Sequence, residues 1–138
     1  MPENLAGNIP HEGPMRWLDS AGAEHDASIT AQHEIPADHP FLIQGRLPRS
    51  ALIEYIAQTA AAGGLGPIAQ NPMPHQISGM LVALRDVRFY GVVGAGDSLT
   101  LRVAVTHRIG NMFRCRGQAH CGKTLMCEGW FSFSILSR

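Results

Sequence analysis

One segment limits the possible folds more than any other, the run SALIEYIAQTAAAGGLG at residues 50–66. Drawn as a helix, it has apolar residues on nearly every side, and its polar positions are mainly Ser50, Glu54 and Gln58. A helix that is apolar nearly all round is buried. The rest of the chain is therefore expected to surround it.

The residues beside this segment predict where the helix begins and ends. Pro48 precedes the helix, and Ser50 can cap its first turn. The pair Gly63-Gly64 can end it, which predicts a helix over about 49–63. Alanines in its second half have short side chains, so other backbone can approach closely, as a helix inside a curved sheet requires.

The other predicted elements are strands, in which apolar and polar residues alternate. They cover residues 27–35, 79–90, 98–107, 113–120 and 125–135. One buried helix followed by about four consecutive strands predicts an α+β fold in which an antiparallel sheet covers the helix. A length of 138 residues fits a single domain.

Composition excludes several classes of function. Eleven basic residues balance eleven acidic ones, so neither nucleic acid nor an anionic membrane is an expected partner. No apolar stretch approaches the ~20 residues of a membrane span. Residues 1–15 lack the apolar core of a signal peptide, and Cys115, Cys121 and Cys127 form no CxxC pair. These features predict a cytoplasmic protein without a metal site.

Four segments, in order, resemble one family. GRLPRSALIEYIAQ (45–58) resembles the helix entry of 3-hydroxyacyl-acyl-carrier-protein dehydratases of the FabZ and FabA type. IPHEGPMRWLD (9–19) looks like the opening of that family, LRDVRFYGVVGAGDSLTLRVAV (84–105) like its strand, turn and strand, and 113–135 like its final hairpin. The most similar members are the ApeP-like dehydratases of aryl polyene gene clusters, which share a G-x-LP-x(4)-[LI]-E-x-[MI]-AQ pattern.

The resemblance implies a hotdog fold over residues 1–138, with one long central helix wrapped by a strongly curved antiparallel sheet of about five to six strands. It also implies a cofactor-independent hydro-lyase that converts 3-hydroxyacyl thioesters, on acyl carrier protein or coenzyme A, to trans-2-enoyl thioesters. Such proteins pair with a second copy or with another hotdog protein, and the active site lies at the interface.

Dehydration of a 3-hydroxyacyl thioester needs a base for the proton next to the carbonyl, an acid for the leaving hydroxyl, and donors for the enolate oxygen. Glu54 suits the acid role because a carboxyl group with apolar neighbours holds its proton more readily. The family's histidine lies in a GHFP motif, but here the similar GRLP has Arg46 in that place, eight residues before Glu54. His39, fifteen residues before Glu54, is the candidate base.

Five further residues are candidates for substrate binding. Backbone N–H groups near Ser50 and Ala51 can polarise the thioester carbonyl. Gln58, one turn after Glu54, either orients that carboxyl or satisfies a backbone group. His11 stands where the family has a histidine and lines the pocket or has a structural role. Arg46 holds a carrier phosphate, pairs with an acid, or is an ordinary surface guanidinium.

The sequence leaves two alternatives to the dehydratase open. Hotdog thioesterases also use a helical carboxylate, and release of free thiol from an acyl-CoA would distinguish them. The other alternative is a non-catalytic subunit that completes the site of an active dehydratase. Arg46 in the histidine place is the feature that favours it.

Overall fold

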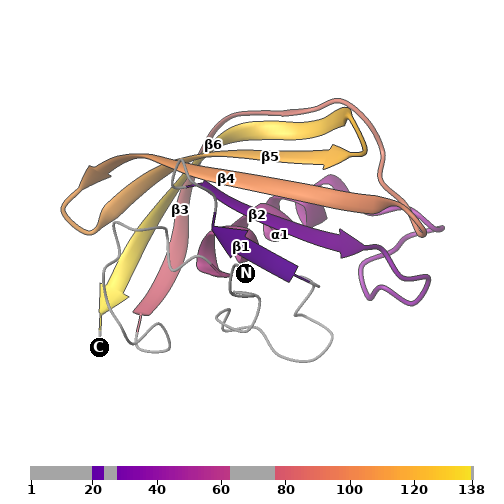
Figure 1. Cartoon of the computed structure of the whole chain (residues 1–138), viewed down its shortest axis with the longest axis horizontal. Helices are drawn as coiled ribbons and strands as arrows, with labels where there is room; N and C mark the ends of the chain where they lie inside the picture. The colour runs from indigo at the N-terminus through magenta and orange to yellow at the C-terminus, as the bar shows by residue number, and fades with distance from the viewer. Residues whose placement is uncertain (1–19, 24–27, 63–76, 138) are drawn as a thin grey trace.

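A computed structural model describes residues 20–23, 28–62 and 77–137 of the chain. Its elements, in order, are β1 (Ser20–Ala23), β2 (Ser28–Glu34), α1 (Arg49–Ala62), β3 (Ile77–Phe89), β4 (Ser98–Ile109), β5 (Met112–Cys121) and β6 (Thr124–Ser137). The strands form one sheet in the order β1-β2-β4-β5-β6-β3, and every neighbouring pair is antiparallel. The sheet arches over α1, which lies on its inner side (Figure 1). The predicted α+β class and curved antiparallel sheet are confirmed, with six strands.

Every second residue along the strands faces the helix and helps to cover it. In β4, Leu99, Leu101 and Val103 are each at most 1% exposed, while the residues between them are partly exposed. The inner face of β5 holds Phe113, Cys115, Gly117 and Ala119, all buried. These are the faces that the period-two pattern predicts.

The helix is buried on most of its surface but not all of it. Leu52, Tyr55 and Ile56 are at most 2% exposed, and the polar Gln58 is 0% exposed. A narrow stripe along the helix is only half-buried; its members are Ile53, Glu54, Ala57 and Ala61. The prediction of a helix buried nearly all round is therefore confirmed except on this stripe and in the first turn, where Arg49 and Ser50 are exposed.

Glycine at position 117 allows β5 to pass close to α1. A Cβ atom there would lie 2.5 Å from Cγ2 of Ile56 and 2.9 Å from the Phe131 ring. Any larger residue would push the strand and the helix apart, because core packing leaves no such space.

Two elements differ from the sequence prediction. β1 was not predicted, because it has four residues, SAGA, without the branched or aromatic side chains that mark a strand. β3 begins at Ile77, before the predicted start. It pairs with β6, and the register of this pairing shifts between Leu81 and Ala83 and between Arg85 and Arg88. The other predicted strands and the helix agree within a few residues.

β3 lies at one edge of the sheet and is the longest uncovered edge of the described chain. It has 13 residues, and Met80, Val82 and Leu84 are between 45% and 54% exposed. Long apolar edge strands are rarely left open to water, because their free N–H and C=O groups pair with other strands.

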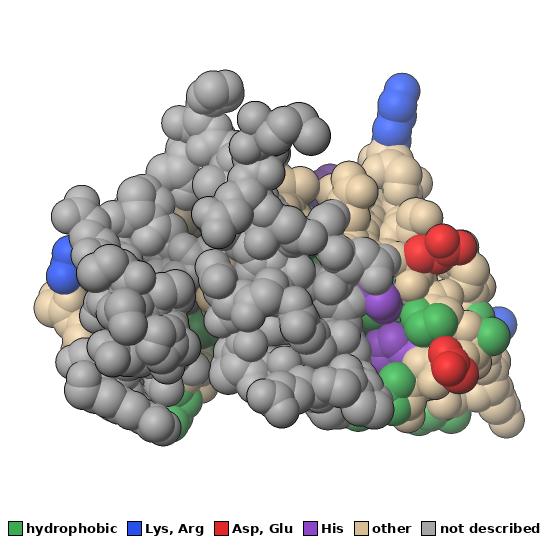
Figure 2. Space-filling view, turned by 60° about the horizontal axis from the view of Figure 1, so that its bottom comes forward, with side chains coloured by type: hydrophobic (Ala, Val, Ile, Leu, Met, Phe, Trp, Pro, Cys, Tyr) green, Lys and Arg blue, Asp and Glu red, His purple; other side chains and the backbone are tan. Residues whose placement is uncertain are grey.

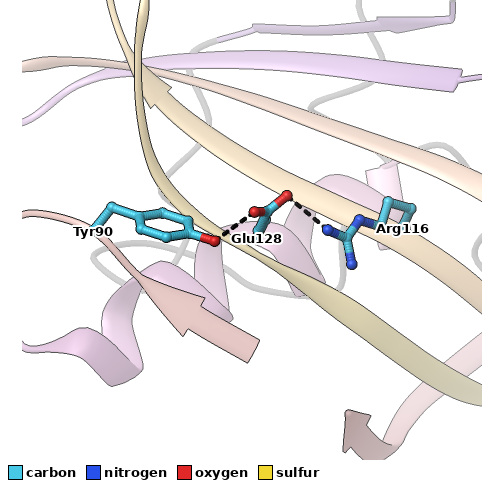
Figure 3. Close-up of polar contacts among 3 residues, drawn as sticks. All are labelled: Tyr90, Arg116 and Glu128. Carbon is cyan, nitrogen blue, oxygen red and sulfur yellow. Dashed lines mark hydrogen bonds and ion pairs between the residues drawn. The ribbon is translucent and has the colours of Figure 1, made fainter. Parts of the chain in front are cut away.

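A polar network on the outer face of the sheet ties the end of β3 to β5 and β6 (Figure 3). The Tyr90 hydroxyl donates to Oε2 of Glu128 at 2.6 Å, and the Arg116 guanidinium donates to Oε1 at 2.6 Å. The Arg116 guanidinium also lies 5.1 Å from the Trp130 ring centre. The hydrogen bond from Tyr90 is the main cause that lowers the pKa of Glu128. The network joins strands on the face opposite the helix.

Candidate active site

The segment between β2 and α1 carries His39, and both of its ends are fixed to one loop. At the first end, the N–H of Ile35 donates to the carbonyl of Asp97 at 2.9 Å. At the second, the N–H of Leu47 donates to the carbonyl of Val93 at 2.8 Å. The loop before β4 therefore sets where the histidine segment leaves the sheet and where it enters the helix.

Arg46 lies in a tight turn at the second end of this segment. Its N–H donates to the Ile43 carbonyl at 3.1 Å and its carbonyl accepts from the Ile43 N–H at 2.8 Å. Gln44 and Gly45 have φ values of 52° and 76°, and Gly45 suits this left-handed conformation. A Cβ on Gly94 would meet the Gly45 carbonyl oxygen at 2.6 Å, so the two loops touch backbone to backbone. Arg46 itself is exposed.

His39 is 4% exposed and is held at both ring nitrogens. Its Nε2 lies 3.1 Å from the hydroxyl oxygen of Tyr55, which is 0% exposed. The backbone N–H of Phe41 donates to its Nδ1 at 3.1 Å. The ring of His33, on β2, lies 6.4 Å from the His39 ring and 5.5 Å from the Tyr55 ring. Histidine side chains reach the surface beside acidic and hydrophobic ones (Figure 2).

The surroundings of His39 favour its neutral form. Burial is the main cause that lowers the pKa of His39 below its ordinary value of 6.5, and the charge of nearby His33 lowers it further. Asp38 acts in the opposite direction. An imidazole that stays neutral near pH 7 can accept a proton.

Glu54 projects from the half-buried stripe of α1. The side-chain amide of Gln58 donates to its Oε1 at 3.1 Å, and Gln58 is 0% exposed. The hydrogen bond considered from the sequence is therefore present. It holds one carboxyl oxygen of Glu54 beside Gln58, one helical turn further on.

Glu54 leaves the helix in a different direction from the residue that contacts His39. Tyr55, which contacts His39, directly follows Glu54, and successive residues on a helix point about 100° apart. Tyr55 therefore points under the histidine segment while Glu54 points along the stripe. Sequence reasoning missed Tyr55 because it was counted among the apolar helix residues. The available signal was that a buried phenol needs a hydrogen-bond partner.

The remaining predicted site residues are Ser50, Ala51 and His11. Ser50 is exposed in the first turn, and the N–H of Ala51 donates to the Pro48 carbonyl at 3.0 Å. The Ala51 amide is thus already engaged, and the role of both residues in polarising a carbonyl stays a prediction. His11 lies outside the described residues.

Within the described ranges, no three His, Cys, Asp or Glu side chains gather in a way that could hold a metal ion. Nor is any helix in those ranges both long and apolar enough to cross a membrane. The cytoplasmic location stays a prediction.

A curved antiparallel sheet around one helix is the hotdog architecture. On this architecture the chain places an acidic residue, Glu54, on the helix and a nearly buried histidine, His39, in the segment before it.

Comparison with known proteins narrows this class. The family model of the ApeP-like proteins, described as ApeP dehydratase, matches residues 3–132. The chain belongs to this family of dehydratases. The predicted family of dehydratases is therefore confirmed.

Named relatives and a solved structure agree with this assignment. The 3-hydroxyacyl-[acyl-carrier-protein] dehydratase FabZ of Coxiella burnetii is 30% identical over 127 residues, covering 87% of this chain and 88% of the relative. FabZ of Natranaerobius thermophilus is 26% identical and covers 94% of this chain and 93% of its own. The dehydratase heterocomplex ApeI:P from Xenorhabdus doucetiae has a TM-score of 0.82 at 22% identity, covering 100% of this chain and 94% of that one.

The thioesterase alternative has weaker support. A hypothetical thioesterase of Streptococcus pneumoniae, solved with coenzyme A, has a TM-score of 0.65 at 10% identity and covers 86% of each chain. This likeness shows a shared fold alone, whereas the dehydratase relatives match in sequence as well.

Proposed function

We propose that this dehydratase acts on 3-hydroxyacyl groups carried by an acyl carrier protein, in a site shared by two hotdog subunits. In this proposal His39 of one subunit is the base and Glu54 of the other is the acid. The observation that carries it is a neutral, nearly buried histidine held by Tyr55, beside a helical carboxyl group at Glu54 that leaves the helix in a different direction from Tyr55. The carrier is proposed from the relatives, whose names specify acyl carrier protein.

The reaction balances with these two residues alone. His39 takes the proton from the carbon next to the thioester carbonyl, and the electron pair moves to form an enolate. As the enolate collapses, the double bond forms between the second and third carbons and the bond to the hydroxyl breaks. Glu54 gives its proton to the departing hydroxyl, which leaves as water. The proton on His39 then returns to Glu54 through solvent.

The open edge of β3 supports the second subunit. Antiparallel pairing along its 13 residues would satisfy the edge N–H and C=O groups and cover Met80, Val82 and Leu84. The same pairing would bring the helices of the two subunits toward each other, because α1 lies against β3. The partner is either a second copy or another hotdog chain. The Xenorhabdus doucetiae structure is named as a heterocomplex.

The first experiment measures enoyl absorbance with 3-hydroxyacyl groups on acyl carrier protein and on coenzyme A. We expect His39→Ala and Glu54→Gln each to lower kcat by about 10²- to 10⁴-fold, the usual contribution of a general acid or base. His107→Asn, which changes an exposed histidine on β4, is the matched control and should keep the wild-type rate. Free thiol released in place of enoyl product would favour the thioesterase.

Mixing the two inactive variants tests whether the site is shared. After unfolding and refolding together, a His39→Ala subunit paired with a Glu54→Gln subunit has one site with both groups intact. Partial recovery of activity is expected. Failure to recover, with both variants folded and paired, would mean that each subunit holds a complete site. Product formed only after a second hotdog protein is added would favour the non-catalytic subunit.

A further inference from the structure

Tyr55 contacts His39 beneath the surface, in a place that the proposed mechanism leaves without a role. The Tyr55 hydroxyl oxygen lies 3.1 Å from His39 Nε2, and Tyr55 is 0% exposed. It is too deeply buried to be the first group that a substrate meets. Any effect it has on the reaction must pass through the histidine.

The contact at the other nitrogen decides which way this hydrogen bond runs. Nδ1 of His39 accepts a hydrogen bond from the Phe41 backbone N–H at 3.1 Å, so Nδ1 carries a lone pair. A neutral imidazole has one N–H, which must then be on Nε2. Nε2 therefore donates to the Tyr55 oxygen, and the only lone pair able to take up a proton is on Nδ1.

We infer that Tyr55 is a positioning residue of the active site, which holds the Nε2–H of His39 so that Nδ1 is the nitrogen that accepts the substrate proton. This inference rests on the proposed role of His39 as base. When Nδ1 takes up the proton, the Phe41 N–H must give way, because two donors cannot face each other. Tyr55 keeps the ring in place through this change, since its oxygen accepts from Nε2–H in both the neutral and the charged ring.

The groups around the ring determine the direction of the pH effect. His33 on β2 opposes the positive charge on His39, Asp38 in the same segment favours it, and the Tyr55 oxygen on α1 accepts from the charged ring. Removing the Tyr55 hydroxyl takes away one group that stabilises the charged form, so the pKa of His39 falls. The base is active when neutral, so the acidic side of the pH–rate profile moves to lower pH.

The first measurement reads the ring nitrogens directly and needs no activity. Long-range proton–nitrogen correlation spectra of the full ¹⁵N-labelled chain are recorded well above the ordinary histidine pKa of about 6.5. We expect His39 to carry its proton on Nε2. A proton on Nδ1 would overturn the inference.

The second measurement uses Tyr55→Phe, with Tyr90→Phe as the matched control. Both lose one phenol hydroxyl that makes a hydrogen bond, but Tyr90 lies on the outer face of the sheet. We expect Tyr55→Phe to lower kcat about tenfold with little change in KM, the cost of one hydrogen bond to a charged group. It should also move the acidic limb of the pH–rate profile to lower pH. In the nitrogen spectra, a larger fraction of His39 rings should carry the proton on Nδ1. Tyr90→Phe should change none of these.

The outcomes separate this inference from the proposed function. A Tyr55→Phe variant with the wild-type spectrum, kcat and pH profile would leave Tyr55 a packing residue only. If the wild-type chain makes no enoyl product at all, the proposed function fails, and the nitrogen spectra of wild type and Tyr55→Phe still decide whether Tyr55 holds His39.

Discussion

Burial determines the chemistry of the cysteine side chains. Cys115 on β5 and Cys127 on β6 are 0% exposed on the inner face of the sheet. Burial raises the pKa of the Cys115 thiol to about 12 and is the main cause that raises that of Cys127 to about 11. Because the thiolate is the reactive form, both thiols are expected to be inert in the folded protein.

This leads to a prediction for thiol labelling. At mildly alkaline pH, the partly buried Cys121 should react first with an aromatic disulfide reagent, and Cys115 and Cys127 only on unfolding in urea. Mass spectrometry of the labelled peptides gives the order, and Cys121→Ser should abolish the early label. Rapid labelling of Cys115 in the native protein would mean that β5 opens locally.

Some residues of the site could be predicted from the sequence and others could not, for physical reasons. Glu54 and Gln58 could be paired from their spacing because a helix brings residues four apart together. His39 could be chosen only by its distance from Glu54. The partner of His39 could not be predicted, because Tyr55 meets it through a segment whose path depends on backbone contacts with a loop far along the chain.

The sequence predicted some features of the elements and not others. Alternation predicted the inner faces of β4 and β5 correctly. In β6 it was correct from Cys127 to Phe133, but not at Leu125, which is only half-buried and pairs with His120 across an irregularity in the register. Alternation contains no information about strand order, so it could not predict that β3, next in the chain after the helix, pairs with β6 at the far edge. It also could not predict β1, whose small residues lack any alternation.

The contact between α1 and β5 can be tested by Gly117→Ala. The added methyl group would lie 2.5 Å from Cγ2 of Ile56, so we expect a loss of about 1–3 kcal/mol in the free energy of unfolding. Urea denaturation measures this loss. Ile56→Ala makes room on the helix, so the double variant should lose less stability than the sum of the two single changes. A purely additive result would mean that the methyl group is accommodated elsewhere.

For the whole molecule, the edge strand β3 is the feature that argues for a second subunit. Its exposed apolar residues would be costly in a monomer and are well placed for strand pairing. The stability and the activity of this chain are therefore expected to depend on its concentration.

Charge placed on this edge should separate the subunits. We expect Val82→Lys combined with Leu84→Lys to give a monomer by light scattering after gel filtration, with most of the dehydratase activity lost. Ile109→Lys adds charge at a residue that is 79% exposed on the β4–β5 hairpin and should leave the assembly intact. A double variant that stays paired and active would place the interface on another surface.

The two ends of the histidine segment are joined to the same loop, at Ile35 with Asp97 and at Leu47 with Val93. A loop with fixed ends tolerates added or lost residues at little entropic cost, because closing it is only weakly length-dependent. The entropy of loop closure therefore does not fix the number of residues between the histidine and the helix. Fifteen residues from His39 to Glu54 is then one of several workable spacings. Distant members of the family would be found more reliably by requiring a histidine anywhere between these two points of attachment than by a motif of fixed length.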